Sequence, residues 1–222
     1  MTDSFDAVIV GSGPNGLSAG ILLAQNGLRV LILEAKSSIG GGTRTQELTE
    51  PGFLHDVCSA VHPTAVASPF LKTLPLNEFG LDWCYPNFPV AHPLDDGQAV
   101  VVTKSLEETI QRLGSDGKAY ARMVRPLVER WDELSPDFFA PIRIPKKPVQ
   151  LAKFGMLGMH SAVKLAKRFK EASTRGFFAG LAAHSILPLE NRFTASFGLI
   201  FSATIHAANW PIAKGGSASI TH

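Results

Sequence analysis

The apolar pattern of the first 33 residues predicts a strand, a helix and a second strand in succession. Residues 6–10 form a short β-branched run that ends at Gly11 and is typical of a buried parallel strand. Small and apolar side chains then recur over 17–24 and stop before Gly27, which suits the left-handed position at a helix end. A second strand is expected over 29–33. Together these elements form a βαβ unit of ordinary length.

The rest of the chain has a different pattern, which predicts one hairpin and several helices. Strand-like runs at 89–94 and 98–103 flank a turn signal, Asp95-Asp96-Gly97. The expected helices are 105–114, with Ser105 as N-cap and Glu108 three residues later; 116–134, interrupted at Pro126; and 151–176, with breaks allowed at Gly155 and Gly158. A parallel start followed by an antiparallel piece and many helices indicates two domains.

Residues 11–16, GSGPNG, form a G-x-G-x-x-G motif between the first strand and its helix. Gly11 permits the tight turn, Gly13 lets the backbone approach a pyrophosphate, and Gly16 allows the helix to pack on the strand. The helix N-terminus supplies free N–H groups for phosphates. Glu34, 18 residues after Gly16, would accept hydrogen bonds from ribose hydroxyls and repel a 2′-phosphate, which disfavours NADP. A glycine-rich turn without a ligand is the weaker alternative, because strand, spacing and acid agree.

A second glycine cluster, GGGTRT at 40–45, begins six residues after Glu34. Its small residues allow close backbone approach, and Arg44 is a candidate phosphate ligand. A nicotinamide enzyme of simple Rossmann type has no need for such a cluster, so FAD is the expected dinucleotide.

The stretch EAKSSIGGGTRT at 34–45 resembles the ribose-acid and double-glycine signature of the amine-oxidase and phytoene-desaturase superfamily of FAD flavoproteins. Within it, the chain is most similar to bacterial phytoene desaturase-related oxidoreductases. The resemblance covers nearly the whole chain through four further segments: PGFLHDVCSAVHP at 51–63, AHPLDDG at 91–97, FFAGLAAHSILPL at 177–189 and WPIAKGGSASIT at 210–221.

Carried over by position, the resemblance implies a set of cofactor-binding residues. These are Gly11, Gly13, Asn15 and Gly16 at the pyrophosphate; Glu34, Ala35 and Lys36 at the ribose and adenosine; Gly41, Gly42, Thr43 and Arg44 at the phosphate and ribityl region; and Ser59 to His62 near the flavin ring. Relatives commonly have arginine directly after the glycine pair, whereas Gly42 stands there and the arginine comes two positions later. The role of Arg44 is therefore left open.

The resemblance also implies the fold class, α/β, with a Rossmann-like FAD-binding domain interrupted by an inserted α+β substrate domain. The expected boundaries are 1–67 for the first part of the FAD domain, 68–210 for the substrate domain and 211–222 for the start of the return. Relatives are longer, and a sheet of two or three strands would leave an exposed edge. The chain is therefore expected to be an N-terminal fragment, or to need a second chain that completes the FAD site.

The expected activity is that of an FAD-dependent oxidoreductase, a dehydrogenase or desaturase acting on a small apolar substrate such as a polyene. A redox-neutral FAD-dependent isomerase and a nonenzymatic partner subunit or inactive fragment are the alternatives. No catalytic residue and no metal site is predicted. His184 and His206 lie in uncharged stretches, where a role in lining a substrate cavity competes with the favoured role of buried, hydrogen-bonded structural histidines.

Charge and cysteine usage bear on the binding partners and the cellular location of the protein. The net charge of +2 is too small to indicate nucleic-acid binding, but residues 141–175 hold nine basic residues and one acid. Within this region 159–175 is expected to form one basic amphipathic helix, either an ordinary surface helix or a contact with an anionic membrane. The uncharged stretch 193–213 is expected to be a buried helix. Two distant cysteines and the absence of a signal peptide indicate a cytoplasmic protein.

Overall fold

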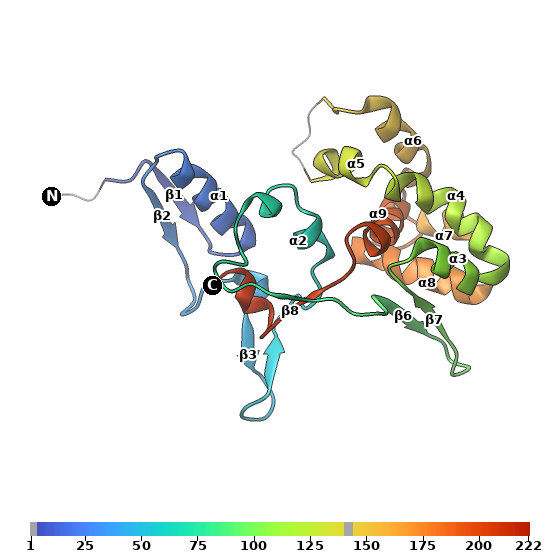
Figure 1. Ribbon diagram of the computed structural model, residues 1–222, viewed down its shortest axis with the longest axis horizontal. Helices are drawn as coiled ribbons and strands as arrows, with labels where there is room; N and C mark the ends of the chain where they lie inside the picture. The colour runs from blue at the N-terminus through green and yellow to red at the C-terminus, as the bar shows by residue number, and fades with distance from the viewer. Residues whose placement is uncertain (1–3, 140–143) are drawn as a thin grey trace. The chain divides into compact units, whose positions relative to one another are not determined.

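The computed structural model describes residues 4–139 and 144–222. The chain divides into two compact units, each built from segments that are not contiguous in sequence (Figure 1). The first unit consists of Met1–His62, Phe70–Cys84 and Pro211–His222, and the second of Pro63–Pro69 and Tyr85–Trp210. Residues 70–84 therefore belong to the first unit, whereas the sequence-based boundary at residue 67 placed them in the substrate domain.

The first unit begins with the βαβ element that the sequence predicts. Its parts are β1 (Ala7–Val10), α1 (Pro14–Gln25) and β2 (Val30–Leu33). β1 and β2 pair in parallel from Ala7 opposite Val30 to Val10 opposite Leu33. Pro14 occupies the first helical turn, where its missing N–H has no intrahelical partner to lose, and Gly27 follows the helix with φ +81°.

Short elements complete the first unit. They are η1 (Gly41–Thr43), β3 (Thr45–Glu47), β4 (Leu54–Asp56), η2 (Leu71–Thr73), β5 (Trp83–Cys84), β8 (Ile212–Ala213) and η5 (Ser217–Ile220). β3 pairs with β4 and β5 pairs with β8, both antiparallel. The parallel sheet has only the strands β1 and β2 among the described residues, and Val10 is 85% exposed. An apolar strand side chain in water is unfavourable, as expected for a sheet of so few strands.

The second unit is mostly helical. Its elements are α2 (Pro63–Ala67), β6 (Val90–Pro93), β7 (Ala99–Val102), α3 (Leu106–Arg112), η3 (Gly114–Asp116), α4 (Gly117–Val128), α5 (Trp131–Phe138), α6 (Pro148–Gly158), α7 (Ala162–Ala166), α8 (Ala172–Ala182), η4 (Ala183–Ser185) and α9 (Thr194–Ala207). β6 and β7 form the predicted hairpin. The Ser105 side chain accepts the Glu108 N–H at 3.2 Å, so the predicted cap of α3 is confirmed.

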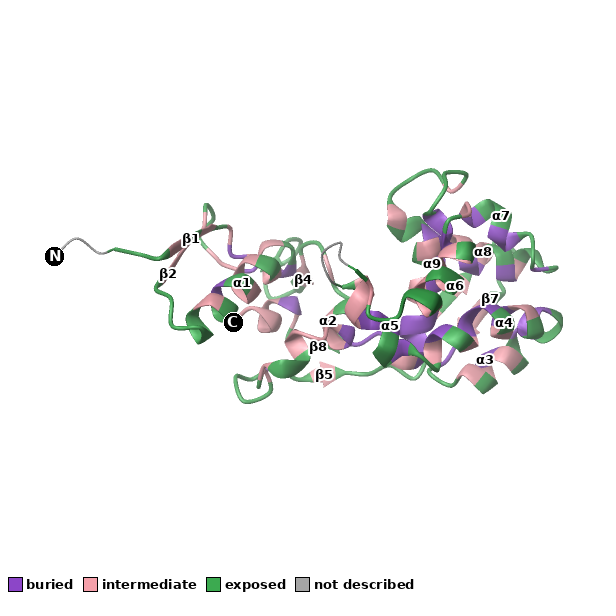
Figure 2. Cartoon of the chain, turned by 90° about the horizontal axis from the view of Figure 1, so that it is seen from above, coloured by how far each residue is buried: buried purple, intermediate pink, exposed green. Residues whose placement is uncertain are grey.

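The core of the second unit surrounds α9, which packs against α4, α6, α7 and α8. Figure 2 shows the buried positions gathered mainly on the helices of this unit. Phe178 and Leu199 are fully buried, and full burial of such a side chain contributes about 1.5–3 kcal/mol. The uncharged stretch 193–213 therefore contains a buried helix, as predicted. Among the residues described, no helix is both long and apolar enough to cross a membrane.

The predicted interruption at Pro126 is wrong. α4 continues through Pro126 to Val128, and the break falls at residues 129–130, before α5 begins at Trp131. Pro126 is exposed and lies in the last turn of α4. Its missing N–H leaves the carbonyl of Arg122 without its usual helical donor, but the helix continues for two more residues before it ends.

The predicted basic helix over 159–175 is also wrong. α6 ends at Gly158, and two separate helices follow, because local and distant caps interrupt the segment. The Ser161 hydroxyl accepts the Lys164 N–H at 3.1 Å and starts α7. The buried Asp116 carboxylate accepts the N–H groups of Lys170 and Glu171, at 2.7 and 2.9 Å, where α8 starts. The basic side chains of this segment therefore do not share one helical face, on which the membrane argument depended.

Candidate dinucleotide-binding site

The turn after β1 requires glycine at two positions for different reasons. Gly11 has φ +100°, a conformation that side-chain-bearing residues rarely adopt. A Cβ on Gly16 would lie 2.1 Å from the carbonyl oxygen of Gly11, so the first turn of α1 packs directly on this loop. Together the two glycines direct the N-terminus of α1 to the carboxyl end of β1.

The N-terminus of α1 has the features of an anion site. Its N-cap, Gly13, provides no side-chain cap, and no acidic residue lies in the first turn. The N–H groups of a first helical turn have no intrahelical acceptors, and the helix dipole adds partial positive charge. A phosphate group can therefore bind here without displacing a protein side chain.

Glu34 follows β2, and its carboxylate accepts three hydrogen bonds. The Ser12 hydroxyl and N–H donate to Oε2 at 2.5 and 3.0 Å, and the Lys36 N–H donates to Oε1 at 2.9 Å. The Ser12 hydroxyl, these backbone N–H groups and the nearby Arg44 charge lower the pKa of Glu34 to about 2. Glu34 is therefore ionised at neutral pH and fixed beside the glycine loop.

Arg44 connects Glu34 to the second glycine cluster. Its Nη2 lies 3.2 Å from Glu34 Oε1, and its Nε–H and Nη1–H donate to the carbonyl oxygens of Ser38 and Gly41 at 3.0 and 3.3 Å. The side chain is mostly buried, so this pair is screened less than a surface pair. In this structure the guanidinium holds the acid and the 38–41 turn together.

The second glycine cluster packs on the first. Gly40 and Gly41 have φ +111° and +54°, and a Cβ on Gly41 would lie 2.9 Å from the Cα of Gly13. The Gly40 N–H donates to the Ser12 carbonyl at 2.9 Å. Thr43 is buried, and its hydroxyl donates to the Gly40 carbonyl at 2.7 Å. The two glycine segments therefore form one surface in which the backbones of Gly13 and Gly41 are in direct contact.

The other predicted cofactor residues are exposed in the same unit. Asn15 is exposed in the first turn of α1, and Ala35 and Lys36 are exposed after β2. Gly42 is exposed, and its carbonyl accepts the N–H and the hydroxyl of Ser59, each at 3.1 Å. The structure thus brings the predicted residues of 11–16, 34–36 and 41–44 together in one unit.

A partly buried polar network joins the C-terminal segment to this region. The Asp56 carboxylate accepts the Ser217 N–H and the Thr45 hydroxyl, each at 2.7 Å. The Ser217 hydroxyl donates to the Ser59 carbonyl at 2.6 Å, so the His62 Nε2–H must donate to Ser217 Oγ, at 2.7 Å. Burial raises the pKa of Asp56, but the Ser217 and Thr45 hydrogen bonds outweigh it and the net pKa is lowered. Burial also lowers the pKa of His62.

Sequence reasoning missed most of these supporting residues. Ser12 occupies a variable position of the glycine motif, which gives no signal for a contact with Glu34. Asp56 and Ser217 are 161 residues apart. The resemblance at 51–63 and 210–221 indicated that both segments matter, but it contained no information on their contact.

His184 and His206, both in the second unit, have structural contacts. His206 is buried; its Nδ1–H donates to the Lys104 carbonyl at 3.1 Å, so its Nε2 accepts the Tyr120 hydroxyl at 2.9 Å. The favoured interpretation of His206 as a buried, hydrogen-bonded residue is confirmed. His184 is exposed, so the prediction that it is buried is wrong. Its Nδ1 lies 3.1 Å from the Leu181 carbonyl and its ring packs on Phe201.

The residues of the first unit fit a bound dinucleotide. The uncapped helix end suits a pyrophosphate, the glycine surface leaves room for close approach, and Glu34 is an ionised acceptor at the end of β2. Comparison with protein families matches residues 9–74 to the NAD(P)-binding Rossmann-like domain. The chain therefore contains a Rossmann-like dinucleotide-binding domain.

Known proteins similar to the chain include a limonene dehydrogenase subunit and flavin-containing amine oxidases. A limonene dehydrogenase component of Castellaniella defragrans is 27% identical over 168 residues, 76% of this chain and 30% of that protein. A flavin-containing amine oxidase of Danio rerio is 27% identical over 145 residues, 60% of this chain and 28% of that protein. The structure of putrescine oxidase bound to putrescine matches with a TM-score of 0.60 at 20% identity, over 98% of this chain and 47% of that chain.

These matches confirm the predicted relationship to the flavin amine oxidases and the Rossmann-like fold. The structural match, at 20% identity, concerns the fold. The chain spans 28–30% of the length of these two curated relatives and about half of the matched solved structure.

Proposed function

We propose that this chain binds FAD through the Rossmann-like site and that its protein is an FAD-dependent oxidoreductase. The observation that carries the proposal is the position of Glu34, an ionised carboxylate fixed by Ser12 and linked by Arg44 to the second glycine cluster. This arrangement combines an acceptor for ribose hydroxyls with two glycine segments in contact.

Each part of the site has a proposed role. The N-terminus of α1 and the Gly11–Gly16 loop bind the pyrophosphate, and Glu34 binds the adenosine ribose. Residues 41–43 line the region next to the pyrophosphate, and residues 59–62 approach the flavin ring. Bound FAD would supply the hydride or electron acceptor, and the protein would position it and exclude competing reactions.

FAD is favoured over NADP by charge and by the second glycine cluster. The Glu34 carboxylate would repel a 2′-phosphate. The cluster adds a second backbone surface that a simple nicotinamide site does not need. The amine oxidase relatives are named as flavin-containing enzymes, which supports the choice of FAD.

The proposed substrate is small and apolar, and a polyene is the finer proposal. The limonene dehydrogenase relative is named for a hydrocarbon, which supports an apolar substrate. No side chain is assigned as a catalytic acid or base, because hydride transfer to a flavin requires positioning of the substrate more than proton transfer by the protein.

The test is a titration of the purified 222-residue chain with FAD, followed by flavin fluorescence and calorimetry. FAD should bind, NADP⁺ should bind more weakly, and Glu34→Gln should weaken FAD binding about tenfold or more, because a charged acceptor is lost. Glu47→Gln, an exposed acid of the same unit, is the matched control. If FAD fails to bind, or if NADP⁺ binds more tightly, the proposal is wrong.

A second measurement concerns the reaction. FAD-loaded protein is mixed with limonene under anaerobic conditions, and the visible absorbance of the flavin is followed over time. Lasting bleaching supports substrate oxidation. Product formation without net bleaching would contradict the oxidoreductase proposal in favour of a redox-neutral isomerase.

A further inference from the structure

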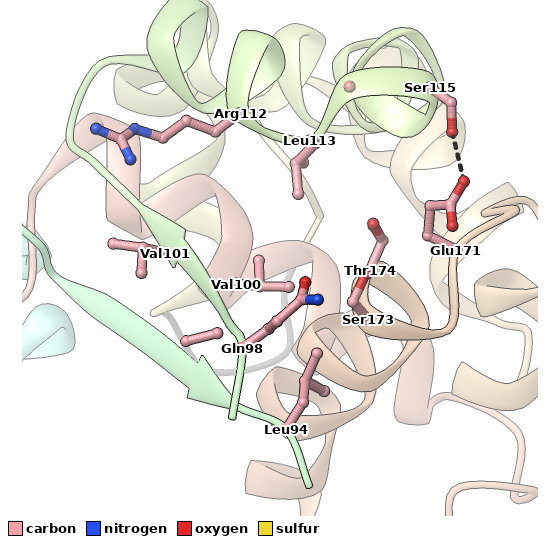
Figure 3. Close-up of a pocket in the computed structure, with 12 residues that line it drawn as sticks. Leu94, Gln98, Val100, Val101, Arg112, Leu113, Ser115, Glu171, Ser173 and Thr174 are labelled. Carbon is pink, nitrogen blue, oxygen red and sulfur yellow. Dashed lines mark hydrogen bonds between the residues drawn. The ribbon is translucent and has the colours of Figure 1, made fainter. Parts of the chain in front are cut away.

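The second unit contains a pocket of about 490 Å³ that is separate from the residues of the dinucleotide site. Three segments form it: the β6–β7 hairpin, the end of α3 with η3, and the start of α8 (Figure 3). Its volume lies within the range of small-molecule sites, about 300–1,000 Å³.

One wall of the pocket carries a hydroxyl group that has no protein partner among the described residues. Thr174 is 2% exposed and lines the pocket, yet its hydroxyl has no hydrogen bond to any residue that the structure describes. Ser173, beside it, is likewise without a side-chain hydrogen bond within the described chain. Figure 3 shows both side chains in the space between β7, Leu113 and Glu171. Both hydroxyl groups can therefore exchange hydrogen bonds with a ligand or with water in the pocket.

Glu171 contributes an acceptor to the same wall. Its Oε1 accepts the Ser115 hydroxyl at 3.0 Å, as the dashed line in Figure 3 marks. A carboxylate has about four lone-pair positions, so most of its capacity remains free. The Asp116 carboxylate already takes the N–H groups of Lys170 and Glu171 at the start of α8. The N-terminal end of α8 therefore presents carboxylate acceptors and hydroxyl groups.

The charges around the pocket disfavour ions of either sign. Arg112 donates twice to Glu108 and lies over the Phe88 ring, so its charge is already paired. Glu171 forms no ion pair within the described part of the chain, and its charge repels an anion. Ser173 and Thr174 lie in the first turn of α8, where the helix dipole opposes the attraction of Glu171 for a cation.

A neutral ligand with several hydroxyl groups suits both the polar wall and the apolar wall of the pocket. Its hydroxyls can donate to Glu171 and exchange hydrogen bonds with Ser173 and Thr174. The facing wall contains Val100 and Leu113, which suit the C–H face of a ring.

We propose that this pocket binds a small neutral polyol of the sugar class, with its hydroxyl groups on Glu171 and Thr174 and its C–H face on the β7 wall. The ligand class follows from the unpaired hydroxyl and carboxylate groups, the paired arginine and the apolar facing wall. The site does not depend on FAD binding.

The test is a titration of the ¹⁵N-labelled full chain with D-glucose, glycerol, butylammonium and acetate, read from amide shifts. D-glucose should perturb the amides of residues 98–101, 113–115 and 171–174, and should bind more tightly than the two ions. Glu171→Gln should weaken D-glucose binding about tenfold, because hydrogen bonds to a charged acceptor are the stronger ones. Thr174→Val should weaken it severalfold.

Matched controls separate binding from folding. Glu190→Gln and Thr64→Val change exposed residues outside the pocket and should leave D-glucose binding unchanged. Thr174→Val should keep or raise Tm, because its hydroxyl has no protein partner to lose. Saturable binding of butylammonium or acetate in preference to D-glucose, or D-glucose shifts insensitive to Glu171→Gln and Thr174→Val, would overturn the proposal. So would an absence of D-glucose shifts at these amides.

Discussion

Gly198 and Gly155 both lie inside helices of the second unit, but alanine should have opposite effects at the two positions. A Cβ on Gly198 would lie 2.7 Å from Cζ of Phe178 and 2.9 Å from Cε2. Phe178 is fully buried, so its ring cannot move into solvent. A Cβ on Gly155 would meet nothing within 4 Å.

The magnitudes follow from two opposing terms. Replacing glycine by alanine in a helix gains about 0.8–1 kcal/mol from backbone entropy. Overpacking a core costs about 1–3 kcal/mol, and contacts below 3.0 Å against a trapped ring belong at the upper end. Gly198→Ala should therefore lose about 2 kcal/mol, or about 4–8 °C in Tm, whereas Gly155→Ala should gain about 1 kcal/mol.

Thermal unfolding by circular dichroism and urea titration measure both variants against the unmodified chain. The pair has its own internal control, because the propensity gain is common to both sites. If Gly198→Ala stabilises the chain as much as Gly155→Ala, the packing of α8 against α9 through Phe178 is refuted.

Three further outcomes are expected. Gly16→Ala should abolish FAD binding in calorimetry, since its Cβ would lie 2.1 Å from the Gly11 carbonyl and α1 could not keep its place; retained affinity would contradict the loop geometry. Burial lowers the pKa of His206 below 6.5, so the unfolded chain binds the proton more readily and the free energy of unfolding should fall as pH drops through about 6.5. Urea midpoints at about pH 7.5 and 5.5 measure this, and His206→Gln should reduce the difference. Because the pKa of Glu34 is lowered from 4.5 to about 2, the stability that its carboxylate contributes should be present above pH 4.5 and lost toward pH 2. Glu34→Gln should show a smaller loss of Tm over that interval, and an equal loss would argue against the Ser12 contact.

Local chemistry made several features predictable from the sequence. The βαβ unit, the Gly27 helix stop, the Ser105 cap and the β6–β7 hairpin depend on residues within a few positions of one another. Periodicity and capping rules act over that distance, so the pattern carries the information. The glycine motif and Glu34 were identified for the same reason, because a strand, a turn and an acid at fixed spacing define that half of the site.

Partners far apart in sequence were decided only by the tertiary structure. Asp116 takes the N–H groups of residues 170–171 and thereby breaks the predicted helix 159–175, although no pattern within that segment marks the break. Asp56 meets Ser217, 161 residues away, in the same manner. A hydrogen bond between distant segments depends on how the chain folds back and not on residue spacing. It therefore produces no periodic pattern in the sequence. The sequence therefore determined the nucleotide-binding motif, and the fold decided what holds that motif in place.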